Sequence, residues 1–162
     1  MTPNEEIRLI LMSIRKIARA LDIHSRYLNK ESGLTLPQLI VLHCVRDLGA
    51  PSGSAIAKAV DLSPPTVLGI LDKLTAKGLI ERQRLENNRR VVVSRLTEQG
   101  EALLADSPSP LGEQFSSRYF ALNEEERRKL IDSLETFADL TKSEKLDEIA
   151  KLVSSTVPTS QL

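Results

Sequence analysis

The stretch that most constrains the fold is "DLSPPTVLGILDKLTAKGL", residues 61–79, where two prolines lead directly into a helical pattern. Proline lacks a backbone N–H and fixes φ near about −65°, so a helix tolerates it only in its first turn. We therefore expect this helix to begin at Pro65, with Pro64 or Ser63 as its cap. Its apolar residues recur at helical spacing on one side: Val67, Ile70, Leu71 and Leu74.

The segments on either side of this helix predict the rest of one motif. A short helix is expected over 54–60, and the turn "DLS" joins it to the proline-led helix. After Gly78 the pattern changes to period two, which with the β-branched run 91–93 indicates a hairpin with a polar, basic tip at "ENNRR". Helix, tight turn, helix and hairpin in this order predict a winged helix-turn-helix. Its core is expected to hold Ile56, Val60, Leu62, Leu79 and Ile80 with the four residues above.

Two helices are expected before this motif. Residues 5–28 place apolar residues at steps of three and four, and Gly33 is the expected stop. Over 36–48, Thr35 is the expected N-cap with Gln38 as its capping-box partner, and Gly49 ends the helix. This second helix is apolar on most sides, so we expect it to be largely buried through Leu39, Ile40, Leu42, Cys44, Val45 and Leu48.

The C-terminal part predicts further helices. Thr97 is the expected cap of "LTEQGEALLAD", and the prolines of 107–110 should interrupt the helix there. Helical patterns follow over 111–122 and 144–153, and Asn123 is the expected cap of a helix over 124–140.

Charge and composition narrow the function classes. The 22 basic and 22 acidic residues cancel, but residues 54–95 hold eight Lys/Arg against four Asp/Glu, whereas residues 96–162 hold seven against thirteen. This asymmetry indicates either a basic working surface on an acidic scaffold or random scatter over short windows. Aromatic residues make up 3% of the chain with no Trp, so a stacking platform for nucleic acid is not expected.

Several classes of site have no support in the sequence. Cys44 is the single cysteine, which excludes an intrachain disulfide and a cysteine-based zinc site, and His24 and His43 lack metal-ligand spacing. No nucleophile elbow, phosphate loop or metalloprotease pattern is present, so we expect neither an enzyme nor a cofactor. With an acidic N-terminus and no apolar run near 18 residues, we expect a cytoplasmic protein without a membrane partner.

The candidate site combines two surfaces. Subtracting the core positions leaves a face of small groups on the proline-led helix, which suits the major groove of DNA, and the basic wing tip suits the minor groove. The alternatives are a rigid helix start and a solvated basic turn. The candidate DNA-binding residues are Ser63, Pro64, Pro65, Thr66, Gly69 and Lys73 on the helix and Arg84, Asn88, Arg89 and Arg90 on the wing.

With these residues in place, "AIAKAVDLSPPTVLGILDKLTAKGLIERQRLENNRRVVVSRLTEQG" resembles the core of a MarR-type transcriptional regulator. The resemblance covers residues 35–104 well and the flanking helices more loosely. It implies a recognition helix over 63–77 in the major groove and a wing over 84–92 in the minor groove, with Arg90 as the inserted arginine. It also implies a homodimer, formed by residues 5–30 and 111–153, on a pseudo-palindromic double-stranded operator, with repression as the family's common mode.

The resulting fold prediction is mainly α with a small β-hairpin wing. It divides the chain into a winged helix-turn-helix region over 35–100 and a helical dimerisation region over 1–34 and 101–162, in one continuous fold. A protein-interaction winged helix without DNA binding is the alternative function.

Three positions depart from the family pattern. Asn88 stands where an Asp usually orients the wing arginine, Gly69 replaces a long polar side chain, and "SPSP" interrupts a usually continuous helix. Members often bind a small aromatic or anionic effector, for which Arg15, Arg19 and His24 are the candidate residues. The alternatives are a solvated helix face for the two arginines and a helix surface or a subunit contact for His24.

Overall fold

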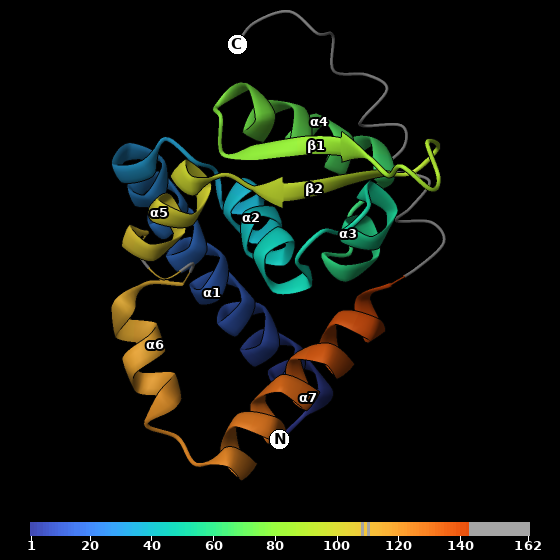
Figure 1. Cartoon of the computed structure of the whole chain (residues 1–162). Helices are drawn as coiled ribbons and strands as arrows, with labels where there is room; N and C mark the ends of the chain where they lie inside the picture. The colour runs from blue at the N-terminus through green and yellow to red at the C-terminus, as the bar shows by residue number, and fades with distance from the viewer. Residues whose placement is uncertain (108, 110, 143–162) are drawn as a thin grey trace, which may run out of the picture. The chain divides into compact units, whose positions relative to one another are not determined.

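The computed structural model describes residues 1–107, 109 and 111–142, and in this part the chain is mainly helical with one antiparallel hairpin (Figure 1). The predicted fold class, a mainly α winged helix-turn-helix, is confirmed. Pro108 and Pro110 of the expected helix break, and the helix expected over 144–153, lie outside the described residues. The elements in chain order are α1 (Pro3–Ser32), α2 (Leu36–Leu48), α3 (Gly53–Ala59), α4 (Pro64–Ala76), β1 (Ile80–Arg84), β2 (Val92–Leu96), α5 (Glu98–Asp106), α6 (Glu113–Phe120) and α7 (Glu124–Thr141).

Local capping chemistry fixes most helix ends where the sequence predicts them. Thr35 and Asn123 each form a full capping box, and Thr97 accepts a hydrogen bond from the Gly100 N–H. Gly33 ends α1 with φ of 68°, a conformation that favours glycine. These predictions hold because each cap depends on residues within four positions of one another.

Helix α4 begins one residue earlier than predicted, and its cap is one of the two residues that the sequence allows. Ser63 is the cap, with an extended backbone (φ −66°, ψ 146°), and Pro64 rather than Pro65 is the first helical residue. Both prolines therefore lie in the first turn, where the amide nitrogens need no partner within the helix.

The core of the winged helix is built from α2, α3, α4 and the hairpin. Every core residue expected on α3 and α4 is buried or packs partly buried against the core, and Leu79 and Ile80 are buried at the base of the hairpin. The prediction for α2 was wrong at two positions: Ile40 and Leu48 are exposed, while Leu39, Leu42 and Val45 are buried. Ile40 and Leu48 lie outside the core because the described elements cover fewer sides of α2 than its apolar composition indicates.

The hairpin pairs in a register that holds the wing against the helices. Ile80 pairs with Leu96 and Arg84 with Val92. The Ser94 N–H donates to the Pro51 carbonyl at 2.9 Å, so the segment before α3 extends the pairing of β2. In Figure 1, α4 runs toward the base of the hairpin and β1 returns, so the start of α4 and the wing tip lie at the same end.

The start of α5 is fastened to the turn between α4 and β1. Thr97 Oγ1 donates to the Gly78 carbonyl at 2.6 Å, and the Thr97 N–H donates to the Leu79 carbonyl at 3.1 Å. Gly100 is buried directly against this turn, and a Cβ built on it would overlap the Leu79 carbonyl oxygen. The motif "LTEQG" therefore joins the wing strand to α5 through a backbone contact that only glycine allows.

The predicted apolar face of α1 is present but uncovered. Leu28 is the buried residue of this helix, whereas Ile7, Ile10, Leu11 and Ile14 are all exposed. The described residues form two compact units, Met1–Ser116 and the part from Ser117 onward, and α7 of the second unit also exposes apolar side chains: Leu130, Ile131, Leu134 and Leu140. The predicted division at residues 35–100 stays a prediction.

Candidate nucleic-acid interface

The outer face of α4 contains small and uncharged side chains over its first two turns. All four core residues of this helix point inward, and Ser63, Pro64, Pro65, Thr66 and Gly69 are exposed, as the sequence predicts. A Cβ at Gly69 would meet no heavy atom within 4 Å, so the backbone there is open to a ligand. The small side chains of Ser63 and Thr66 and the bare backbone of Gly69 let this part of the helix approach a surface closely.

The hydroxyl groups of Ser63 and Thr66, at the start of α4, are hydrogen-bonded to each other. Ser63 Oγ accepts from the Thr66 N–H at 3.3 Å and lies 2.7 Å from Thr66 Oγ1. This arrangement is the N-cap of the helix, and it uses much of the hydrogen-bonding capacity that the sequence offered for contacts with bases or phosphates.

Two charged residues, Asp72 and Lys73, lie further along α4, and of these Asp72 forms an ion pair. Arg82 of β1 donates to Asp72 at 2.8 Å, which ties the wing strand to the helix. Lys73 is exposed, and its ammonium group has no side-chain partner among the described residues. Lys73 is therefore available to an anionic ligand such as phosphate.

The wing tip is shaped by Asn88. Its carbonyl accepts from the Val91 N–H at 2.9 Å, and its Oδ1 accepts from the Arg90 N–H at 3.2 Å. The side chain of Asn88 thus bonds the backbone of Arg90, and it does not orient the Arg90 guanidinium as a family aspartate would. Asn88 defines the turn, and among the described residues the Arg90 side chain forms no ion pair.

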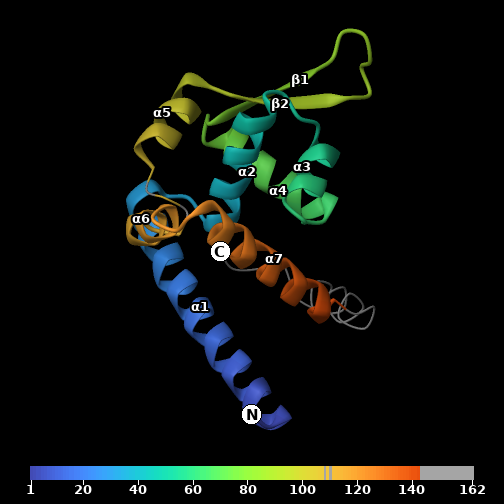
Figure 2. The ribbon, with the colours of Figure 1, turned by 90° about the horizontal axis from the view of Figure 1, so that it is seen from below.

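Three arginines surround this tip. Arg84, Arg89 and Arg90 are exposed, and none of them forms an ion pair within the described part of the chain. In Figure 2 the loop between β1 and β2, which contains Arg89 and Arg90, projects away from α3 and α4. Unpaired guanidinium groups at the end of a projecting loop suit the narrow, negative minor groove of a duplex.

Sequence reasoning missed one residue of this surface. Leu68 lies on α4 between buried Val67 and open Gly69, and it is 48% exposed. The signal was available, because helical spacing excludes Leu68 from the core set of Val67, Ile70, Leu71 and Leu74.

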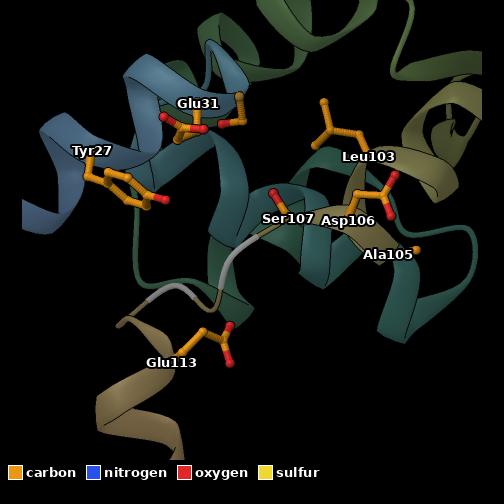
Figure 3. A pocket seen from close by; sticks show the side chains of 8 residues that line it. Tyr27, Glu31, Leu103, Ala105, Asp106, Ser107 and Glu113 are labelled. Atoms are coloured by element: carbon orange, nitrogen blue, oxygen red, sulfur yellow. The ribbon is translucent and has the colours of Figure 1, made fainter.

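A cavity of about 620 Å³ lies in the first unit, between α1 and the end of α5 (Figure 3). Three of its lining residues are acidic, Glu31, Asp106 and Glu113, and Tyr27 contributes an aromatic ring. Among the candidate effector residues, Arg15 and Arg19 are exposed on α1 and do not line it. His24 lies beside it: its ring is 6.2 Å from that of Tyr27, and Nε2 donates to the Ser109 carbonyl at 2.8 Å.

The remaining reactive groups point to no chemistry of their own. Burial raises the pKa of the Cys44 thiol, which keeps it protonated and a poor nucleophile at neutral pH. Within the described residues, no three His, Cys, Asp or Glu side chains are grouped to hold a metal ion, and no helix is long and apolar enough to cross a membrane.

Comparison with known proteins places these features in context. The sequence profile of the MarR family matches residues 34–92. The transcriptional repressor NicR of Pseudomonas putida is 36% identical over 108 residues, which are 62% of this chain and 68% of that protein.

Solved structures agree with this match. Bordetella bronchiseptica BpsR, whose DNA binding is regulated by 6-hydroxynicotinic acid, is 31% identical over 77% of this chain and 91% of its own, with a TM-score of 0.60. A MarR variant from E. coli, solved with operator DNA, is 25% identical over 85% of this chain and 99% of its own, with a TM-score of 0.63.

Proposed function

We propose that this chain, which belongs to the MarR family of DNA-binding transcriptional regulators, acts as a homodimeric repressor on a pseudo-palindromic operator. In this proposal α4 enters the major groove and the wing enters the minor groove. Two-fold symmetry puts the two copies of α4 about one helical turn of DNA apart, so half-sites about 10 bp apart are expected.

The observation that carries the proposal is that the start of α4 and the wing tip lie at the same end of the winged helix. Between Ser63 and Gly69 the start of α4 carries no charged or amide side chain, and the neighbouring wing tip presents three arginines that form no ion pair within the described residues. Phosphate contacts from Lys73 and the wing would supply most of the affinity. The zero net charge of the chain does not oppose this, because the basic residues gather where the duplex would lie.

Dimerisation rests on the exposed apolar faces. Ile7, Ile10, Ile14 and Ile17 lie along one side of α1 with 38–57% of their surface exposed. A monomer would leave this long apolar stripe in water, and burying it against a second copy removes that cost. The apolar residues of α7 offer a second such surface.

A selection from a random duplex pool tests the function directly. The purified chain is expected to enrich a two-fold palindrome, and fluorescence anisotropy should show affinity falling roughly 100-fold or more between 50 and 200 mM salt, because several phosphate contacts release counterions. Analytical ultracentrifugation of the same sample should give twice the 18.0 kDa mass of one chain.

Each other outcome has a definite meaning. A weak, sequence-independent signal that disappears at 200 mM salt would contradict operator recognition and favour a protein-binding winged helix. An enriched site without two-fold symmetry, or a mass of one chain at micromolar concentration, would contradict the dimer. Binding that increases transcription from a promoter carrying the site would contradict repression alone.

A small-molecule effector belongs to the same proposal. The cavity lies between α1 and the end of α5. The start of α5 is connected to the wing, since Thr97 fastens it to Gly78 in the turn before β1. Its carboxylates attract cations and repel anions, so we expect amines rather than carboxylic acids to bind there.

Adding aromatic amines and aromatic acids, 6-hydroxynicotinic acid among them, to the anisotropy assay checks this effector prediction. Operator affinity is expected to fall with amines and to stay unchanged with acids. A response to acids alone would move the effector site toward Arg15 and Arg19.

A further inference from the structure

The recognition surface of α4 has little capacity for hydrogen bonds to base edges. From residue 63 to residue 70 the sequence "SPPTVLGI" contains no charged or amide side chain. Its two hydroxyls, on Ser63 and Thr66, are engaged with each other in the N-cap. The bidentate contacts by which Arg reads guanine and Asn or Gln reads adenine are therefore absent from these turns.

One apolar side chain is present there instead. Between residues 49 and 107, all of which the structure describes, Leu68 is the one large hydrophobic side chain that is exposed. Isolated surface leucines are ordinary, but this one lies in the first two turns of α4, whose other outer positions are Pro65, Thr66 and Gly69. Every other large hydrophobic side chain of this stretch is buried or partly buried, so the exposure of Leu68 is an exception within the winged helix.

The position of Leu68 on the helix fits a contact in the groove. At 100° per residue, Pro65 and Gly69 form the centre of the outer face, with Thr66 on one flank and Leu68 on the other. Asp72 lies one turn beyond Leu68 on the same flank and is held by Arg82. Because Gly69 carries no side chain, the helix surface next to Leu68 toward the centre of the outer face is open.

We propose that Leu68 is a specificity-determining residue of this chain and that it reads the 5-methyl group of thymine in each half-site. Among the bases, thymine alone presents a methyl group in the major groove, and apolar side chains recognise it by contact. This inference rests on the proposed function, because it places α4 in the major groove. It adds that direct readout by α4 is mainly apolar and selects T·A pairs.

Deoxyuridine substitution in the selected operator tests the proposal, because uracil lacks only the methyl group and pairs as thymine does. Each thymine is replaced in turn, symmetrically in both half-sites, and affinity is measured by anisotropy. For the wild type we expect one or two positions per half-site at which the symmetric replacement lowers affinity about 10- to 20-fold, the combined effect of two buried methyl groups, one in each half-site. Leu68→Ala should lose a similar amount on the thymine operator and become insensitive to uracil at those positions.

A matched control separates this effect from general damage. Leu48→Ala removes an equally exposed leucine outside α4 and the wing, and it should keep wild-type affinity and wild-type sensitivity to uracil. Leu68→Ala should fold normally, since alanine favours a helix and the position is exposed. Its circular dichroism spectrum and melting temperature check that.

The outcomes distinguish this inference from the function on which it depends. If an operator is bound tightly but no thymine is sensitive to uracil, or the sensitivity persists in Leu68→Ala, the role of Leu68 is overturned and the DNA-binding function stands. If no duplex is enriched at all, the proposed function fails and this inference fails with it.

Discussion

Replacing Arg90 with alanine is expected to lower the affinity for every duplex by roughly 10- to 100-fold at 150 mM salt, because a dimer loses two cationic side chains at once. The Arg90 guanidinium has no partner in the described part of the chain, so no ion pair has to break before it binds DNA. The backbone N–H of Arg90 keeps its bond to Asn88 in the variant, and the wing should keep its shape.

Anisotropy at several salt concentrations measures this effect. The slope of log affinity against log salt should fall by about two per dimer, one for each phosphate that the variant no longer neutralises. Arg128→Ala is the control: it removes the same charge from an exposed position on α7, and it should leave both values unchanged. Equal affinity of Arg90→Ala and the wild type would refute the insertion of the wing into the minor groove.

The largest effect on stability is expected at Gly100. A Cβ there would overlap the Leu79 carbonyl oxygen and lie 3.1 Å from the carbonyl carbon, and both atoms belong to the backbone. Relieving this clash requires the start of α5 to move away from the turn before β1, which weakens the bonds of Thr97 to Gly78 and Leu79. We expect Gly100→Ala to lower the free energy of unfolding by about 2–4 kcal/mol.

Thermal denaturation at one fixed protein concentration tests this, and the expected fall in Tm is roughly 5–15 °C. Gly69→Ala makes the same chemical change inside α4, where a Cβ meets nothing within 4 Å. That variant should be unchanged or more stable by about 0.5–1 kcal/mol, because glycine is a poor helix former. A Gly100→Ala protein as stable as the wild type would show that α5 can shift without cost.

Much of the fold could be predicted because its signals are local. The caps at Thr35, Thr97 and Asn123 and the stop at Gly33 each depend on residues close in sequence. The core set of α4 followed in the same way from helical spacing. The candidate residues of the site could be chosen from the sequence, because its prolines, small residues and basic turn are visible there.

The failures share a different cause. Ile40 and Leu48 have the composition of core residues, yet they are exposed, because burial depends on which elements pack against α2. The cavity beside Tyr27 likewise required α1 and α5, which are far apart in sequence, to meet.

The sequence by itself therefore determined the order of the helices and the hairpin, the caps at Thr35, Thr97 and Asn123, which side of α4 is apolar, and where the cations gather. Hydrogen bonds and side-chain periodicity within a few residues decide these properties. The tertiary structure alone decided that Gly100 touches Leu79 and that Arg82 holds Asp72. Such contacts form only when distant segments pack together, and packing is set by the shape of the whole core rather than by any local pattern.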